Sequence, residues 1–419
     1  MTQDKQHNRP NVPPLRFPEF SGEWNRTSIG DKFELYSGNT PSRLEKDQFV
    51  GKINWITSGE LKNHYIAATN ETITEEAAAN NNLRLLPIGT FVIAIYGLEA
   101  AGVRSTGSIT TEASTISQAC MAFLPKGEIS NEFLYSWYMK HGNIIGLRYA
   151  QGTKQQNLSY DIIERFKISY PNVLEQRKLE KFISLLDRRI AIQSGLIEDL
   201  KSIKKYLMEQ LFCQPKEKSP RLRLGGMSGE WKRVRLCDVV ERVSTRNKTN
   251  ECTRVLTIAA QYGLIDQQEF FNKQIASSDL TTYYLLHRGD FAYNKSYSSD
   301  YPWGAVKRLD NYDEGVLSSL YICFCPNHSI DSDFLRHYFE STKWYRGISE
   351  ISGEGARNHG LLNMSVDDYF NTMHRFPSIE EQTCISHVLN TFDRKVLIEE
   401  SILEKLRRQK SYLLNNMFI

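Results

Sequence analysis

The feature that most constrains the fold of this chain is an internal repeat. Residues 171–212 align without gaps on residues 377–418, at an offset of 206 positions, and 12 of the 42 aligned positions are identical. The tetrapeptide Ser-Gly-Glu-Trp at 21–24 also recurs at 228–231. Self-similarity at a fixed period indicates a structural unit that is used more than once. We therefore expect one module of about 206 residues, present in two copies.

The two copies differ between these shared ends. Residues 30–156 and 237–362 have few identities beyond positional echoes such as Gly89 and Gly289. A duplicated frame with two different inserts suits a protein that must hold two distinct specificities in one geometry. We interpret this contrast as the main indication of function.

Each copy is expected to close with a long helix. Residues 173–212 contain no proline and only one glycine, Gly195, and from Leu196 on their apolar residues recur in steps of four, three and four. This spacing predicts a helix with a seam of the coiled-coil type. We expect the two helices to bury their stripes against each other in antiparallel packing, with two ordinary core helices as the alternative. The predicted stripes are Leu186, Ile192, Leu196, Leu200, Ile203 and Leu207 in the first helix and Phe392, Ile398, Ile402, Leu406 and Leu413 in the second.

The inserts have the pattern of mixed domains. β-type runs such as 90–96, 254–258 and 320–324 are separated by Gly, Asn, Ser and Pro, and helical stretches such as 131–138 and 331–345 lie between them. The expected fold class is α+β, with two mixed α/β domains joined by two long helices in an antiparallel coiled coil and a pseudo-two-fold repeat. The expected segments are a disordered tail at 1–12, a first domain at 13–170, a helical region at 171–213, a linker at 214–221, a second domain at 222–376 and a helical region at 377–419.

Composition indicates an ordinary globular protein, with 40% hydrophobic and 24% charged residues. The apolar runs are far shorter than the roughly 18 residues of a membrane helix, and residues 1–9 lack the apolar core of a signal peptide. We expect a cytoplasmic protein. Among seven scattered cysteines only Cys323 and Cys325 are close, at a spacing unsuited to zinc, so no metal site is expected. The net charge of +3 means that nucleic-acid binding would depend on local clusters.

No catalytic motif is present in the sequence. It has no phosphate loop, no His-Glu-x-x-His, no Gly-x-Ser-x-Gly and no Asn-Pro-Pro-Tyr segment. Asp290 with Lys295 comes nearest to a nuclease pair, but one acidic residue cannot hold the metal that such chemistry needs. A turn at the end of a strand is the simpler interpretation, and we predict no catalytic residue.

A polar loop precedes the closing proline of each module, at 151–157 and at 355–359. Arg, Lys, Asn and Gln carry the donors that match base edges and phosphates. Arg104 and the segment 295–297 are further candidates because they lie in aromatic-rich surroundings, and solvated loops or surface turns are the alternative. The predicted DNA-contacting residues are Arg104, Lys154, Gln155, Gln156, Asn157, Lys295, Tyr297, Arg357, Asn358 and His359.

These motifs together resemble the specificity subunits of type I restriction-modification enzymes, over essentially the whole chain. The resemblance rests on the opening Pro14-Leu-Arg-Phe-Pro-Glu-Phe-Ser-Gly-Glu-Trp24 and its echo at 223–231, and on the closing pattern Pro-x-x-x-Glu-Gln to Asp-Arg at 171–188 and 377–394. In the second opening, Leu-Gly-Gly at 224–226 stands where the first copy has Phe-Pro-Glu, so the entry strand is expected to differ.

The resemblance implies a DNA-binding subunit without catalytic activity in a restriction system. Each domain would read one half of a bipartite double-stranded DNA target, and the helices would set the spacer. The implied partners are two methyltransferase subunits, which methylate adenine with S-adenosylmethionine, and ATP-dependent restriction subunits; those partners, and not this chain, would hold S-adenosylmethionine, ATP and Mg. The implied interface residues are Glu175, Gln176, Asp187, Arg188, Glu381, Gln382, Asp393 and Arg394, for which pairing within the coiled coil is the alternative.

Two other classes of function compete with this interpretation. One is a coiled-coil adapter that binds RNA or proteins and has no sequence-specific contact with duplex DNA. The other is a nuclease or methyltransferase in its own right, which requires a catalytic cluster that the sequence lacks.

Overall fold

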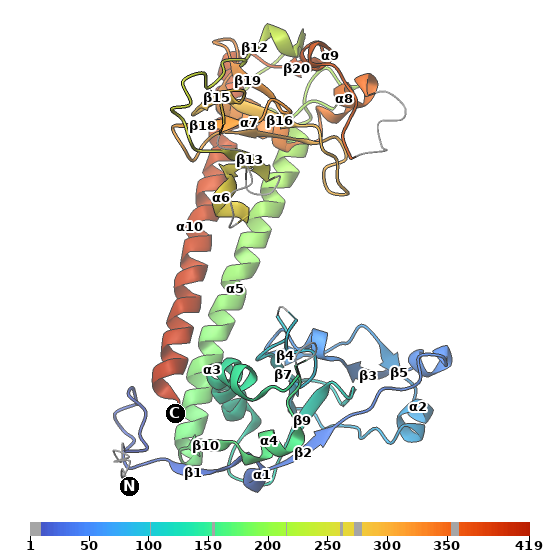
Figure 1. Cartoon of the computed structure of the whole chain (residues 1–419), viewed down its shortest axis with the longest axis vertical. Coiled ribbons are helices and arrows are strands. Elements are labelled where there is room, and N and C mark those ends of the chain that lie inside the picture. The colour runs from blue at the N-terminus through green and yellow to red at the C-terminus, as the bar shows by residue number, and fades with distance from the viewer. Residues whose placement is uncertain are drawn as a thin grey trace. The chain divides into compact units, whose positions relative to one another are not determined.

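The computed structural model describes residues 10–100, 102–152, 156–214, 216–259, 263–271, 279–352 and 360–419. The chain forms two compact units, unit 1 from residues 1–194 and 401–419, and unit 2 from residues 195–400. Both boundaries fall inside long helices (Figure 1). Each unit therefore contains one globular domain and a part of both long helices.

The two long helices are α5, Val173–Leu211, and α10, Ile379–Met417, each of 39 residues. The helices begin two residues after Pro171 and Pro377. A proline that precedes a helix removes none of its backbone hydrogen bonds. In unit 1, Leu179 of α5 shares a core with Met417 of α10, and Asp187 further along α5 pairs with Lys410 at 2.5 Å. Positions rise along one helix as they fall along the other, so the helices are antiparallel here.

Unit 2 has the same arrangement with the other halves of the helices. Lys204 of α5 pairs with Asp393 of α10 at 2.5 Å, and Leu211 shares a core with Ile385. The predicted antiparallel packing is confirmed within each unit. This salt bridge is the repeat equivalent of the one between Asp187 and Lys410. Asp393 lies 206 positions after Asp187, and Lys410 lies 206 positions after Lys204.

The buried seam has a different register from the predicted stripe. In α5 the buried apolar residues include Ile183, Ile197 and Leu211, spaced by multiples of seven. Lys204 holds the seam position between Ile197 and Leu211, and in α10 the seam contains the buried Glu399. Because these seam positions hold polar residues, the seven-residue period is not visible when only apolar residues are counted. Part of the predicted stripe therefore lies one residue before the buried seam. The members of the predicted stripe that are exposed are Ile192 (64%), Leu196 (39%), Ile203 (47%) and Ile398 (55%).

The globular domain of unit 1 is built on a five-stranded sheet of order β2-β9-β6-β7-β4, with α3 packed against it (Figure 1). The central strand β6 is buried on both faces, as its apolar run predicts. Ser130 caps α3 by accepting a hydrogen bond from the backbone N–H of Phe133 at 3.1 Å. The elements are β1 Asn25–Ser28, α1 Ile29–Lys32, β2 Phe33–Ser37, η1 Lys46–Phe49, β3 Ile53–Ile56, η2 Ser58–Glu60, β4 Tyr65–Ile66, β5 Thr72–Ile73, α2 Glu75–Asn80, β6 Phe91–Ala94, β7 Gly107–Thr110, β8 Ser114–Ile116, β9 Cys120–Pro125, α3 Asn131–Tyr149, α4 Tyr160–Arg165 and β10 Lys167–Tyr170.

The core of unit 1 is completed by the end of α10. Phe418 packs against Phe133 of α3 with ring centroids 5.3 Å apart, and Trp137 donates a hydrogen bond from its indole N–H to the carbonyl of Ile419 at 3.0 Å. Leu413 and Leu414 are buried in the same cluster. Residues from the two ends of the sequence therefore form one hydrophobic core.

The globular domain of unit 2 is built on a four-stranded sheet of order β12-β19-β16-β17, with α7 packed against β17. Two-stranded pairs β13–β14 and β15–β18 complete the domain. The elements are β11 Lys232–Arg235, η3 Leu236–Asp238, β12 Val240–Arg242, β13 Leu256–Ala259, β14 Gly263–Asp266, α6 Gln267–Phe271, β15 Tyr284–His287, β16 Phe291–Asn294, β17 Ala305–Arg308, β18 Glu314–Leu317, β19 Ile322–Pro326, α7 Ser332–Glu340, α8 Tyr345–Ile351, α9 Val366–Phe370 and β20 Met373–Phe376.

Each domain has its own central sheet, and the two sheets have the same strand order although the sequences of the domains diverge. The order β2-β9-β6-β7 in unit 1 matches β12-β19-β16-β17 in unit 2, and a helix follows β9 and β19 in each. The entry strands also match, because β1 pairs with β10 and β11 with β20, both antiparallel and over four residues. The expected difference at the second entry strand is therefore absent from the backbone pairing. The predicted fold class, with two mixed domains and an internal repeat, is confirmed.

The state of the cysteines and the polarity of the helices were also subjects of the sequence-based expectations. All seven cysteines are free thiols. Among the described residues, every helix is either too short or too polar to cross a membrane.

Candidate nucleic-acid interface

In unit 1 the structure brings together two of the segments that were singled out separately in the sequence. The loop after β6 lies beside the segment before α4, since the Leu98 N–H donates to the Gln156 carbonyl at 3.0 Å and the Leu158 N–H to the Ile95 carbonyl at 2.9 Å. The guanidinium of Arg104 donates to the side-chain oxygen of Gln156 at 2.7 Å. Arg104 and Gln156 thus form one polar surface although 52 positions separate them.

Further hydrogen bonds fix this polar surface. Asn157 accepts from the Gly97 N–H through its side-chain oxygen at 3.3 Å. The exposed carboxylate of Glu99 accepts from the Gln156 N–H at 2.7 Å, and this bond lowers the pKa of Glu99. The remaining donors of Arg104 and Asn157 are therefore held in defined places, as recognition of a base or phosphate requires.

Unit 2 has the same construction at the corresponding place. The Leu362 N–H donates to the Lys295 carbonyl at 2.9 Å, and the Tyr297 N–H donates to the Gly360 carbonyl at 3.1 Å. The segment after β16 thus lies beside the segment before α9, as the segment after β6 lies beside the one before α4. Lys295 and Tyr297 stand at the counterpart of the Ile95–Leu98 segment. The other predicted contact residues, Lys154, Gln155, Arg357, Asn358 and His359, lie outside the described residues.

Four of the predicted interface residues on the helices have buried side chains. Glu175 and Glu381 accept paired hydrogen bonds from Arg16 (both 2.7 Å) and Arg223. Gln176 and Gln382 donate to the carbonyls of the prolines that precede the helices, at 2.9 and 3.0 Å. All four side chains belong to residues that are at most 2% exposed. They hold the helix to its own domain, which leaves them no surface to offer another subunit.

The other four predicted interface residues are two aspartates, which form ion pairs within their units, and two arginines, which are exposed. Asp187 and Asp393 bind Lys410 and Lys204 within their units, as the alternative interpretation of pairing inside the coiled coil proposed. Arg188 and Arg394 are exposed at equivalent positions of α5 and α10. Among the eight predicted interface residues, these two arginines are the exposed ones, and contact with another subunit stays a prediction.

Sequence reasoning missed the residues that connect each domain to its helices. In unit 1, His64 contacts Glu132 (2.9 Å) and Asp187 (3.4 Å) and lies stacked between Tyr65 and Tyr135, with ring centroids 4.1 and 3.9 Å away. Burial lowers the pKa of His64, but the two carboxylates outweigh this effect and the pKa lies above its usual value.

In unit 2 the corresponding connection is made by arginine. Arg336 of α7 contacts Asp393 at 3.0 Å. The repeat identifies Asp187, Asp393 and their lysine partners, but His64 and Arg336 come from the divergent inserts and have no equivalent positions in the other copy. Only spatial proximity identifies them.

The structure also locates the residues considered for metal or catalysis. Among the described residues, His337, Glu340 and Asp393 are the one group with donors close enough to share a metal ion. Lys204 binds both carboxylates, at 2.9 and 2.5 Å, so a cation already occupies the place that a metal would need. Asp290 accepts a hydrogen bond from the His287 N–H at 2.7 Å, in the strand-end turn that was the simpler interpretation.

Comparison with known proteins adds to this geometry. Residues 21–202 match the family model described as the type I restriction modification DNA specificity domain. The chain is 28% identical over 219 residues to the EcoR124I/EcoR124II type I restriction enzyme specificity subunit of Escherichia coli, covering 51% of this chain and 53% of that protein. This alignment thus spans about half the length of that relative.

A longer match extends over nearly the whole chain. The MjaVIII type I restriction enzyme specificity subunit of Methanocaldococcus jannaschii is 24% identical over 429 residues, covering 98% of this chain and 95% of that protein. The crystal structure of the type I restriction-modification S subunit from M. genitalium aligns with a TM-score of 0.57 at 15% identity, covering 97% and 99% of the two chains. The structural match supports the fold.

The duplicated frame and its two matched polar surfaces define a class of protein with two related recognition modules in one chain. Within that class, the chain is similar to the specificity subunits of type I restriction-modification enzymes.

Proposed function

We propose that this chain is the DNA-recognition subunit of a type I restriction-modification complex and has no catalytic activity of its own. Each globular domain contacts one half of a bipartite duplex target. The observation that carries this proposal is the matched polar surface in the two units, formed by the same pair of segments from divergent sequences. Two surfaces of one construction with different side chains suit two half-sites of different sequence.

The chemistry of these surfaces fits contact with DNA. Arg104, Gln156 and Asn157 in unit 1 and Lys295 and Tyr297 in unit 2 offer guanidinium, amide, ammonium and phenol donors, which match base-edge acceptors and phosphate oxygens. In both units backbone pairing fixes the segments that carry them. A surface that is ordered before binding loses less entropy when DNA is bound.

The long helices fit the role of a spacer between half-sites. A helix of 39 residues is roughly 58 Å long at about 1.5 Å per residue. One turn of duplex DNA is about 34 Å. Each helix is thus longer than one turn of duplex, which fits the proposed role of the helices as a spacer.

The exposed Arg188 and Arg394 support a complex with two copies of one partner. They occupy equivalent positions on α5 and α10, so two identical subunits would meet two equivalent surfaces. We assign these surfaces to methyltransferase subunits, with S-adenosylmethionine bound there, and assign ATP and Mg to restriction subunits. The complex would act on DNA in the cytoplasm.

The proposal is tested by expressing this chain with its methyltransferase and mapping adenine methylation across host DNA by single-molecule sequencing. The expected result is a two-part motif with an unread gap, which disappears when this chain is deleted. Unchanged methylation after deletion, with partner-protein binding retained, would replace the proposal with the adapter hypothesis.

A further inference from the structure

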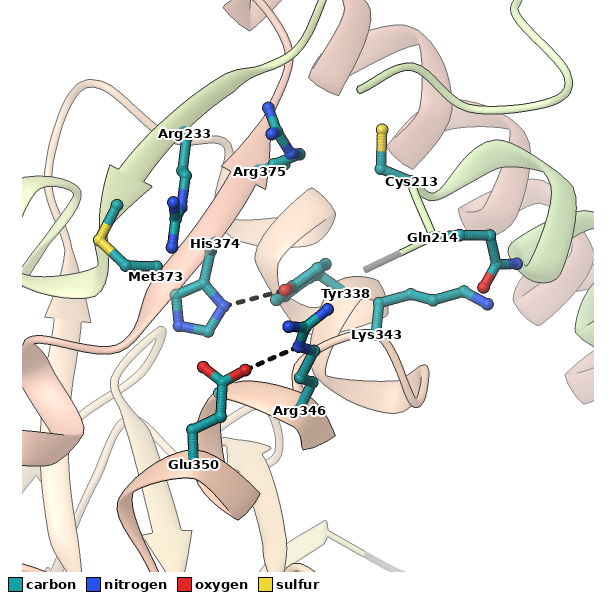
Figure 2. A pocket seen from close by; sticks show the side chains of 11 residues that line it. Cys213, Gln214, Arg233, Tyr338, Lys343, Arg346, Glu350, Met373, His374 and Arg375 are labelled. Carbon is teal, nitrogen blue, oxygen red and sulfur yellow. Dashed lines mark hydrogen bonds and ion pairs between the residues drawn. The ribbon is translucent and has the colours of Figure 1, made fainter. Parts of the chain in front are cut away.

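Unit 2 contains a cavity of about 190 Å³ lined by basic side chains. It lies beside the β11–β20 pair, α7, α8 and the residues that follow α5 (Figure 2). Arg233 and Arg375 come from the two strands, Lys343 from the segment before α8, and Arg346 from the first turn of α8. The single acidic residue in the lining is Glu350.

Two of the four cations are neutralised by carboxylates. Lys343 binds Glu209 of α5, and Arg346 binds Glu350 at 2.7 Å. Arg233 and Arg375 have no carboxylate partner within the described part of the chain; Arg375 donates one hydrogen bond to the Trp231 carbonyl at 3.2 Å. The excess positive charge of the cavity therefore rests on this pair of arginines.

The two arginines lie directly opposite each other. Arg233 and Arg375 are register partners across the antiparallel pair β11–β20. Like charges in opposed positions destabilise a sheet, so the protein gains nothing for its fold from this pairing. An anion bound in the cavity would offset part of this repulsion and accept charge-assisted hydrogen bonds from the arginines.

The floor of the cavity is rigid and neutral. His374 is buried and hydrogen-bonded to the Tyr338 hydroxyl at 2.9 Å and to the Thr372 hydroxyl at 2.8 Å. Its burial lowers its pKa to about 4, so the imidazole carries no charge near neutral pH. The lining therefore contains arginine donors and an uncharged imidazole, and a cavity of about 190 Å³ has room for one tetrahedral anion.

A basic hollow occurs at the corresponding place in unit 1. Arg26 stands 207 positions before Arg233, the offset of the Ser-Gly-Glu-Trp repeat, and lines a hollow of about 500 Å³ with Arg165 and Lys167. The residue opposite Arg26 across the strand pair is Ser169, at the repeat position of Arg375. Both copies have kept positive charge at this place while changing the residues that supply it.

We propose that the cavity of unit 2 binds a backbone phosphate of duplex DNA, held by Arg233 and Arg375; this inference rests on the proposed function. A phosphodiester is the anion that suits the position of the cavity in the chain. Helix α8, which carries Arg346, is followed in the sequence by the predicted base-contacting segment 355–359, and α3 at the unit 1 hollow is followed by 151–157. Phosphate contacts beside base contacts fix the register of a protein on DNA.

The test uses the complete complex with its methyltransferase and compares Arg375→Ser with wild type. Serine stands at the equivalent position 169 in unit 1, so this module accommodates it. The affinity for target and unrelated duplexes is measured at several salt concentrations. We expect equal weakening on both duplexes, a salt slope smaller by about 0.9 for one lost phosphate contact, and an unchanged methylated motif. Arg235→Ser is the matched control, because Arg235 is on β11, the strand that pairs with the strand of Arg375, forms an ion pair with Asp238 at 3.0 Å and lies outside the cavity lining.

The other outcomes distinguish failure of this inference from failure of the proposed function. A wild-type salt slope for Arg375→Ser, with specific binding by the wild-type complex intact, would overturn the phosphate site alone. Absence of specific binding by the wild-type complex would overturn both. Loss of the methyltransferase subunit in place of a DNA effect would assign the cavity to an acidic protein partner. Binding of inorganic pyrophosphate without any change in DNA affinity would assign it to a free phosphate compound, and either result contradicts the proposal.

Discussion

His64 and Arg336 connect a recognition domain to its helices with different chemistry. Both face the repeated aspartate of the helical frame, His64 toward Asp187 and Arg336 toward Asp393. Arginine keeps its charge throughout the physiological range, whereas histidine titrates within it. The two units should therefore respond differently to pH.

The stability of unit 1 is expected to fall as pH rises. His64 faces Glu132 from α3, Asp187 from α5, and the rings of Tyr65 and Tyr135, with Lys410 of α10 on the other side of Asp187. Because the pKa of His64 in the folded protein is raised above its ordinary value of 6.5, the stability that its contacts contribute is complete below that pH and is lost as pH rises through the folded pKa.

Thermal unfolding of unit 1 between about pH 6 and about pH 8.5 measures this effect. The variant His64→Gln should lack the pH-dependent part, and His328→Gln, at an exposed histidine in unit 2, should keep it. A His64 pKa at or below 6.5, measured by NMR with labelled histidine, would contradict the prediction.

At this scale the sequence predicted some residues and could not predict others. Arg104 and Gln156 were identified from their chemistry, and the structure places them in hydrogen-bond contact. His64 and Arg233 were missed because neither belongs to a motif. Their roles depend on neighbours more than 50 residues away in the sequence, namely Glu132 and Asp187 for His64 and Arg375 for Arg233.

The long helices are stabilised at points where charge enters the seam. Asp393 neutralises Lys204 and Arg336 and lies 3.9 Å from His337. Removing one partner of a mostly buried charge pair leaves the others uncompensated. The Asp393 side chain is 28% exposed, so solvent screens part of this cost.

The variant Asp393→Asn should lower the free energy of unfolding of unit 2 by about 2 kcal/mol. Urea denaturation followed by a probe in unit 2 measures the change. Glu400→Gln is the control, since Glu400 forms an exposed pair with Lys201 on the same helices and should change the stability by less than about 1 kcal/mol. Equal effects of the two substitutions would contradict a special role for Asp393.

Helix boundaries were predicted from the sequence more successfully than seam register or strand order. Pro171 and Pro377 mark the starts of α5 and α10 to within two residues, because proline acts locally. The seam depends on which residues face the partner helix, and Lys204 in the seam breaks the apolar pattern. The shared order of the central sheet could not be predicted, because the inserts keep its buried character without keeping its residues.

At the scale of the whole molecule, the two modules should act on separate halves of the target. Arg104→Met and Lys295→Met remove one charged donor from each candidate surface while keeping an apolar stem. Each should cost about 1 to 3 kcal/mol of binding free energy and relax specificity in one half-site only. Competition with duplexes altered in one half or the other measures this, and each variant is the control for the other. Equal relaxation of both half-sites by either variant would contradict the assignment of one domain to one half.

Unit 1 combines residues 1–194 with residues 401–419, and this affects how the protein folds during its synthesis. The ribosome synthesises the Phe133 and Trp137 face of α3 early, but Leu413, Leu414 and Phe418, which cover it, emerge only after all of residues 195–400. The unit whose synthesis begins first is therefore completed last. During translation the apolar face of α3 stays uncovered until the second unit has been synthesised. In this interval the nascent chain is most prone to aggregation and most dependent on chaperones.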